Sequence, residues 1–278
     1  MTVTVNGAEL HYTTRGSGPV CLVLSAIGTP PYERQIPSQL DDQMTLVFVD
    51  LRGGGLSSGD PADLTFDVLA DDLEAIRADL GVERVAVLGH SILGALAIEY
   101  GRRRPLSMSH VIAVGMPPHG DMAAVAAAAA AFFEADATEG RKQILHENLA
   151  ALPPGATPGQ ALFARTPARF FDPRFDAPPL VAGAVLKPAL LAHIMGPLTR
   201  GWAVTAGTPL RTPLLLAHGR YDYVVPHGLW DAVVDRLPTA TWHLFARSGH
   251  QPFVEEPERF AEVASRWMAR TRASDIGA

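Results

Sequence analysis

The sequence predicts an α/β protein whose mostly parallel central sheet carries helices on both faces and an inserted helical segment. Apolar runs without alternation recur along the chain, and such runs suit strands that are buried on both faces of a sheet. Segments with apolar residues at helical spacing separate these runs, which is the chain order of repeated βα units. The alternation breaks at Met116-Pro117-Pro118 and resumes near Pro213. The chain has 278 residues, 47% of them hydrophobic, and is long enough for a large domain carrying an insertion.

An antiparallel hairpin is expected at the start of the chain, because Asn6-Gly7 is a strong signal for a two-residue turn between Thr2–Val5 and Glu9–Thr14. Further strands of the first half are expected at Val20–Leu24, Thr45–Val49, Arg84–Gly89 and His110–Val114. Its helices are expected near Arg34–Leu40, at Phe66–Leu80 and at Ile92–Arg104. The second of these has one broad apolar face, which is typical of a crossover helix between parallel strands.

After the break the composition shifts to alanine-rich and proline-rich stretches. The segment is expected to hold helices at Met122–Ala135, Glu139–Leu152 and Leu180–Ile194, with a proline-rich loop from Pro153 to Pro179. Alternation then resumes with strands at Pro213–Ala217 and Thr241–Ala246, and helices near Gly228–Arg236 and at Pro257–Arg270, before a frayed end. The prediction is therefore an α/β core of residues 1–117 and 208–278, with residues 118–207 as a helical lid over the strand ends.

Charge and composition favour a small-molecule partner. The formal charge of −6 and the pI near 5.9 give no basic surface for nucleic acid, and no basic amphipathic helix suggests a membrane. The start of the chain lacks the pattern of a secretory signal, so we expect a cytoplasmic protein. The lone Cys21 lies in an apolar run and is expected to be buried, and the histidines show no metal-ligand spacing. No cofactor is expected, and a homo-oligomer is compatible with the sequence.

Three polar residues follow predicted strands, and together they suggest nucleophilic catalysis. Ser91, Asp222 and His250 could each be structural, since such residues often cap helices or turns. A serine nucleophile, however, needs a base to take its proton and a carboxylate to orient that base, and these residues occur in the order Ser, Asp, His. Asp121 also follows a strand and is the rival acid. One oxyanion donor is expected to be the N–H of Ile92, and the other to come from the loop after Val20–Leu24.

Four stretches in this order resemble the α/β-hydrolase superfamily, in the branch of esterases, proline iminopeptidases and lactonases. They are Asp50–Ser57, Gly89-His90-Ser91, Gly219–Asp222 and Ser248–Pro257. Two positions depart from the family pattern. Leu93 stands where the elbow usually has glycine, and the loop Ser25–Gly28 lacks the usual His-Gly. With this loop, the backbone N–H of Ile27 is the preferred second oxyanion donor and Thr29 is the alternative.

The resemblance implies a serine hydrolase with a Ser91-His250-Asp222 triad and an acyl-enzyme. The apolar content of the predicted lid favours a small, largely apolar ester, lactone or thioester, with Phe132, Phe171 and Trp202 as expected substrate-binding residues. Acids in the segment allow a proline iminopeptidase as an alternative, because such an enzyme must hold a substrate amine. A non-hydrolytic lyase or cyclase, or a ligand receptor on the same scaffold, remains open.

Overall fold

A computed structural model describes residues 1–275, and its centre is an eight-stranded sheet in the order β1-β2-β4-β3-β5-β6-β7-β8. The strands are β1 (Thr2–Val5), β2 (Ala8–Gly16), β3 (Val20–Ser25), β4 (Thr45–Asp50), β5 (Val85–His90), β6 (Met108–Val114), β7 (Leu214–Gly219) and β8 (Ala240–Phe245). β3 to β8 pair in parallel, whereas β1 and β2 are antiparallel. The predicted fold class is confirmed.

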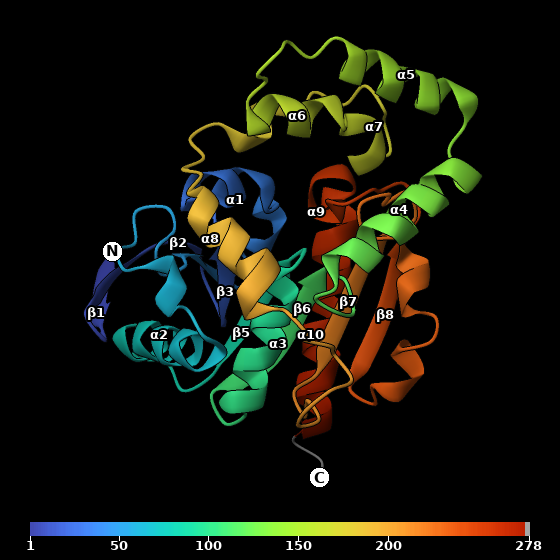
Figure 1. Cartoon of the computed structure of the whole chain (residues 1–278). Coiled ribbons are helices and arrows are strands. Elements are labelled where there is room, and N and C mark those ends of the chain that lie inside the picture. The colour runs from blue at the N-terminus through green and yellow to red at the C-terminus, as the bar shows by residue number, and fades with distance from the viewer. Residues whose placement is uncertain (276–278) are drawn as a thin grey trace.

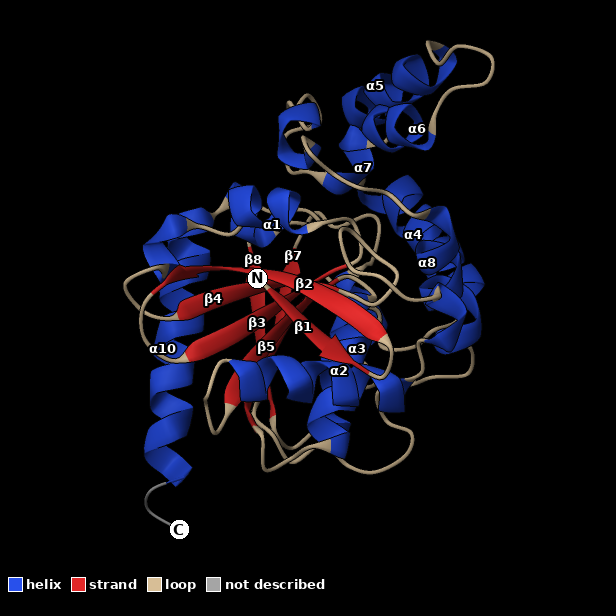
Figure 2. Ribbon diagram, turned by 90° about the vertical axis from the view of Figure 1, so that its left-hand side faces the viewer, coloured by secondary structure: helices blue, strands red, loops and turns tan. Residues whose placement is uncertain are grey.

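Helices cover both faces of the sheet (Figure 2). α2 (Phe66–Asp79) and α3 (Leu93–Arg103) share one apolar cluster with one face. The other face packs against α1 (Thr29–Gln35), α9 (Pro252–Glu255) and α10 (Pro257–Asp275). Burial of both faces explains why β5, like β7, is a continuous run of buried residues.

The opening hairpin forms as predicted, with Val5 paired to Ala8 across the turn. Asn6 and Gly7 both have left-handed φ values, 47° and 75°. These values suit a type I′ turn, whose twist matches that of the strands it joins.

The segment between β6 and β7 lies beyond the sheet. It contains α4 (Met122–Asp136), α5 (Glu139–Ala150), α6 (Pro158–Ala164), α7 (Thr166–Arg169) and α8 (Pro188–His193). Figure 1 shows α5, α6 and α7 above the ends of the strands, with α4 leading up to them. Val125 is the single buried residue of α4 and Arg141 that of α5, so these helices bury little apolar surface. Whether residues 118–207 act as a lid stays a prediction.

Local predictions were wrong in four places, three of them in proline-rich stretches. The first helix begins at Thr29, because Pro30 and Pro31 fit its first turn, and a 3₁₀ turn Ser38–Leu40 follows it. The expected loop Pro153–Pro179 contains α6 and α7, and Thr157 forms a capping box with Gln160.

The expected helix Leu180–Ile194 is instead a 3₁₀ turn Pro178–Val181, then α8, then a π-helical turn Ile194–Leu198. The expected helix near Gly228–Arg236 is two 3₁₀ turns, His227–Trp230 and Val234–Arg236. The last helix runs beyond Arg270 to Asp275, and residues 276–278, where fraying was predicted, lie outside the described residues. None of the helices described within residues 1–275 has the length and apolar character needed to cross a bilayer.

Candidate active site

Ser91 occupies a strained turn between β5 and α3. Its φ is 56°, and among the described residues Asn6 is the only other non-glycine with a positive φ. The Ser91 N–H donates to the Val114 carbonyl at 2.7 Å, and the Ser91 carbonyl accepts from the Gly94 N–H at 3.0 Å. A left-handed serine costs conformational energy and persists only where its surroundings impose it, a situation typical of functional sites. The strand, turn and helix match the geometry that presents a nucleophile.

Two glycines allow this turn, and Leu93 does not obstruct it. A Cβ on Gly89 would lie 2.3 Å from the Leu93 carbonyl oxygen, and a Cβ on Gly94 would lie 2.5 Å from Met116 Sδ. Leu93 itself is 5% exposed and packs in the same apolar cluster as Ile92 and Met116. The close approaches therefore fall at positions 89 and 94, and the leucine between them is an ordinary core residue.

Asp222 and His250 form a buried pair. Asp222 Oδ2 lies 2.8 Å from His250 Nδ1, and the two side chains are 0% and 3% exposed. Asp222 Oδ1 accepts the N–H groups of Val224 and Val225, both at 2.8 Å. Because both carboxylate oxygens accept, Nδ1 of a neutral His250 carries the proton, and the lone pair of Nε2 is left for another donor.

The described contacts bring His250 to the strand end that carries Ser91. His90, the residue before Ser91, donates from Nε2 to the His250 carbonyl at 2.9 Å, and the two rings lie 4.7 Å apart. A Cβ on Gly115, which follows Val114, would lie 3.0 Å from His250 Nδ1. Residues that are far apart in the sequence thus meet at the carboxyl ends of β5, β6 and β7, where ligands bind in open parallel sheets.

His90 supports this arrangement as a neutral side chain. The Tyr32 hydroxyl lies 3.0 Å from its Nδ1, which accepts because Nε2 donates to the His250 carbonyl. Burial holds the pKa of His90 well below its usual value, and neighbouring charge from His250 and Arg169 acts in the same direction. His90 therefore packs beneath the elbow and stays uncharged.

The expected oxyanion donors differ in the hydrogen bonds that their N–H groups make in this structure. Among the described residues, the N–H of Ile92 has no acceptor. The N–H of Ile27 donates to Ser25 Oγ at 3.2 Å, a long contact that a stronger acceptor could replace. Ile27 and Thr29 both remain candidates for the second donor.

Asp121 has another role. Its carboxylate accepts from the Ala124 N–H at 3.0 Å and caps α4, and the residue is exposed. Asp222, by contrast, contacts His250, which favours it as the catalytic acid.

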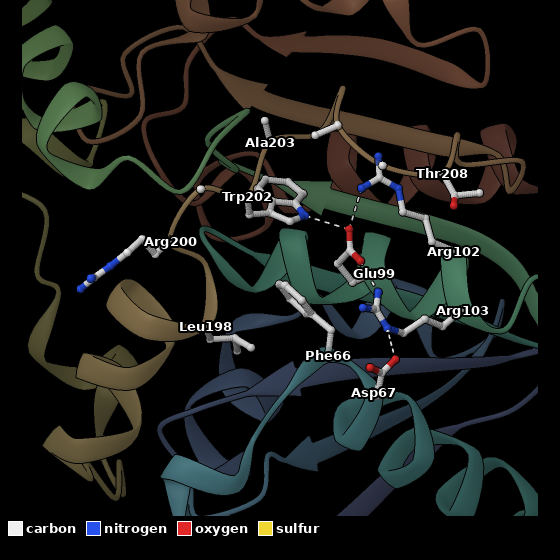
Figure 3. Close-up of a pocket in the computed structure, with 13 residues that line it drawn as sticks. Phe66, Asp67, Glu99, Arg102, Arg103, Leu198, Arg200, Trp202, Ala203 and Thr208 are labelled. Carbon is white, nitrogen blue, oxygen red and sulfur yellow. Dashed lines mark hydrogen bonds and ion pairs between the residues drawn. The ribbon is translucent and has the colours of Figure 1, made fainter.

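The three expected substrate-binding residues do not line one common cavity in this structure. Phe132 packs on the ring of Tyr223 at 5.1 Å, and Phe171 packs on that of Tyr221 at 5.0 Å. Trp202 donates from Nε1 to Glu99 at 2.8 Å, in a pocket of about 550 Å³ whose charged residues include Arg102 and Arg103 (Figure 3). Their role in substrate binding stays a prediction.

Sequence reasoning missed α7, which contacts the loops that carry Asp222 and His250. The Ala168 carbonyl accepts from the Tyr223 N–H at 3.1 Å, and the Arg169 carbonyl accepts from the His250 N–H at 2.7 Å. Arg141 Nη1 donates to the carbonyls of Pro167 and Phe170 at 2.6 and 2.8 Å, and Nη2 to that of Phe171. The Thr166-Pro167 pair is a helix-start signal that could have revealed this element.

Glu255 joins the same α7 region to the histidine loop. Its Oε2 accepts from the Gly249 N–H at 2.7 Å, and its Oε1 from the Phe171 N–H at 2.5 Å. Burial raises the pKa of Glu255 to about 8, although these N–H groups oppose the shift. This carboxyl group therefore titrates near neutral pH, at the contact between two parts of the chain.

Comparison with known proteins gives one consistent family. A family model described as the alpha/beta hydrolase fold matches residues 19–257. The chain is 29% identical over 274 residues to the AB hydrolase superfamily protein YclE of Bacillus subtilis, covering 95% of this chain and 96% of that protein. It is 27% identical over 273 residues to the pimeloyl-[acyl-carrier protein] methyl ester esterase of Nitrosomonas europaea, covering 91% and 97%. The structure of proline iminopeptidase from Mycobacterium smegmatis superimposes with a TM-score of 0.75 at 22% identity, over 99% of both chains.

Proposed function

This chain belongs to the alpha/beta hydrolase fold family, and from that premise we propose that it is a serine hydrolase of a small, largely apolar ester, lactone or thioester. One observation carries the proposal. Ser91 is held in a left-handed elbow, and the neighbouring His250 is oriented by Asp222 so that the lone pair of its Nε2 is left for a donor. Ester hydrolysis by a serine needs a nucleophile and a base that can take its proton.

The proposed reaction has two halves. Ser91 Oγ attacks the acyl carbon while His250 Nε2 takes the hydroxyl proton, and the carbonyl oxygen becomes an oxyanion. Collapse breaks the bond to the leaving group, which takes the proton from His250 and departs, leaving an acyl-serine. A water molecule then gives a proton to His250 and attacks the acyl carbon. The acid is released and the proton returns to Ser91 Oγ.

Backbone donors and Asp222 would stabilise the charges that develop. The N–H of Ile92, which lacks an acceptor among the described residues, and that of Ile27 or Thr29 would bind the oxyanion. Asp222 would stabilise the imidazolium, and the N–H groups of Val224 and Val225 hold its other oxygen. These interactions cost little reorganisation, because the groups are already positioned.

Ester cleavage is favoured over iminopeptidase action because three acids of the segment 118–207, at the ends of α4 and α5, are already paired with cations. Glu134 and Glu139 both contact Lys142, at 2.9 and 3.2 Å, and Asp136 is paired with Arg220 at 2.6 Å. Acids neutralised in this way are poor partners for a substrate amine. The similarity to a methyl ester esterase over most of both chains supports the same choice.

A fluorophosphonate probe tests the proposal directly. We expect it to label Ser91 and not the Ser91→Ala variant, and p-nitrophenyl esters to be turned over repeatedly. The Asp222→Asn variant is expected to lose about 10⁴-fold in kcat, because the wrong histidine tautomer faces the serine. Labelling that persists unchanged in Ser91→Ala would contradict the proposal. Faster release of proline from a proline arylamide than of nitrophenol from the esters would favour an iminopeptidase.

A further inference from the structure

Arg169 is a charged residue that has no role in the proposed hydrolysis. Its backbone carbonyl accepts from the His250 N–H, and Arg169 lines both a cavity of about 510 Å³ and a small cavity that Gln251 also lines. The larger cavity also reaches Tyr223 and Val224, the two residues after Asp222. Arg169 therefore lies beside both loops that carry the proposed base and acid.

Within residues 1–275, the guanidinium of Arg169 makes no hydrogen bond, ion pair or cation–π contact. The carboxylate that raises its pKa is that of Asp222, but both oxygens of Asp222 are occupied by His250, Val224 and Val225. Burial lowers the pKa of Arg169, which shows that the charge is poorly solvated, yet an arginine stays protonated at neutral pH. An unpaired, half-buried cation is costly unless an anion joins it.

The cavity beside Arg169 has an apolar wall and a positive charge. Alanines 126, 129 and 130 and Phe133 of α4 form one side. Arg165, one turn before Arg169, lines the cavity too, and its side chain also has no partner among the described residues. The acid in the lining is Glu134, which is paired with Lys142 at 2.9 Å. The cavity therefore offers two unpaired guanidinium groups and no free carboxylate to balance them.

The position of Arg169 is fixed rather than incidental. The carbonyls of Ala168 and Arg169 accept from the loops of Asp222 and His250, and Arg141 binds three further carbonyls around α7. A binding group must be held in place by its surroundings to act with low entropic cost. These contacts provide that support for the backbone from which the side chain extends.

We propose that Arg169, assisted by Arg165, binds a carboxylate of the substrate, so that the ester carries a second, ionised carboxyl group at the end of an apolar chain. Guanidinium groups match carboxylates in shape and charge, and the alanine wall suits the methylene chain between the two ends. The inference rests on the proposed hydrolase function, because the carboxylate is proposed to belong to the ester that Ser91 would attack.

Matched substrates test the proposal. p-Nitrophenyl monoesters of succinate, adipate and suberate are compared with neutral p-nitrophenyl esters of the same acyl lengths, and 6-acetoxyhexanoate with hexyl acetate. The first series puts the charge on the acyl side and the second pair on the alcohol side. We expect the wild-type protein to prefer the charged member of one set, and that preference identifies the side. Equal kcat/KM for charged and neutral members in both sets would overturn the proposal.

Variants assign the preference to the residue. Arg169→Gln is expected to lower kcat/KM for the preferred anionic ester by about 10- to 100-fold, mainly through KM, because a charge-assisted hydrogen bond is lost. The neutral ester should be affected little, and Arg169→Lys should restore part of the loss. Arg174→Gln removes the same charge from an exposed position of the same segment and should change neither substrate. Equal losses for both esters in Arg169→Gln would show that Arg169 only positions His250, and would refute the carboxylate site.

A binding measurement separates this inference from the proposed function. In the Ser91→Ala background, monomethyl adipate should bind by calorimetry, and adding Arg169→Gln should abolish that binding. Absence of Ser91 labelling by a fluorophosphonate, together with such binding, would refute the hydrolase and keep the anion site. Normal labelling without anion binding or preference would refute the anion site alone.

Discussion

Two regions of the molecule are stabilised in opposite ways. One is the elbow between β5 and α3, and the other is the pair of helices α4 and α5. Every residue of β5 is buried, and nine of the eleven residues of α3 are buried. In α4 and α5, by contrast, each helix has a single buried residue, and that of α5 is Arg141. The elbow is defined by close apolar packing, whereas the helices are positioned by a few polar contacts such as Arg141 to the α7 carbonyls and Asp136 to Arg220. The two regions should therefore respond differently to the same kind of change.

A glycine-to-alanine pair is the strongest test of that difference. Gly89→Ala places a Cβ 2.3 Å from the Leu93 carbonyl oxygen, whereas a Cβ on Gly140 of α5 meets no heavy atom within 4 Å. We expect Gly89→Ala to lose 3 kcal/mol or more, on the order of severe overpacking. Gly140→Ala should gain about 0.5 to 1 kcal/mol from reduced chain entropy. Urea unfolding of both variants measures the contrast, and similar losses in the two would disprove it.

The pH dependence of stability tests the contact that Glu255 makes between the α7 region and the loop that carries His250. Burial raises the pKa of Glu255 to about 8 from the usual 4.5, so the folded state holds this proton more tightly than the unfolded chain. The resulting stabilisation is present below pH 4.5 and is lost as pH rises towards about 8. We expect the free energy of unfolding of wild type to fall over this range by more than that of Glu255→Gln. Parallel pH curves for the two proteins would argue against titration of Glu255.

Leu93→Ala tests whether the elbow needs its leucine for packing or for chemistry. Leu93 is 5% exposed within the core cluster, so truncation should cost about 3 kcal/mol in urea unfolding. The rate at which a fluorophosphonate labels Ser91 should stay near that of wild type, because the close backbone approaches are at Gly89 and Gly94. A large fall in labelling by a folded variant would instead give Leu93 a direct role in the elbow.

Arg141→Met tests the polar positioning of the helices. Loss of its charge-assisted hydrogen bonds should cost about 2 kcal/mol locally, seen as faster hydrogen exchange in residues 166–171 and lower esterase activity. Protection of β5 should be unchanged. Lys142→Met is the matched control, since Lys142 contacts the exposed acids Glu134 and Glu139. Equal changes in both variants would mean that α7 is not held through Arg141.

Much of the fold could be predicted from the sequence, because central strands such as β5 and β7 are buried on both faces and so leave continuous apolar runs. The Asn6-Gly7 hairpin and the crossover helix α2 carry comparably local signals. Proline-rich stretches misled the prediction where a proline begins a helix, as at Thr29 and Thr157. The same residue type can end a helix or start one, and sequence spacing alone does not separate the two.

The candidate site likewise has residues that the sequence predicted and contacts that only the structure shows. The sequence by itself predicted Ser91, Asp222 and His250, because their order at successive strand ends follows from the chain order of the βα units. Only the tertiary structure decided that Asp222 rather than Asp121 contacts His250, and that Arg169 lies beside the loops of Asp222 and His250 with no partner among residues 1–275. The carboxyl ends of parallel strands lie at one edge of the sheet. The repeated βα units that build such a sheet leave a repeating pattern in the sequence. The position of α7 depends on single hydrogen bonds from Arg141, Tyr223 and His250, which leave no periodic signal in the sequence.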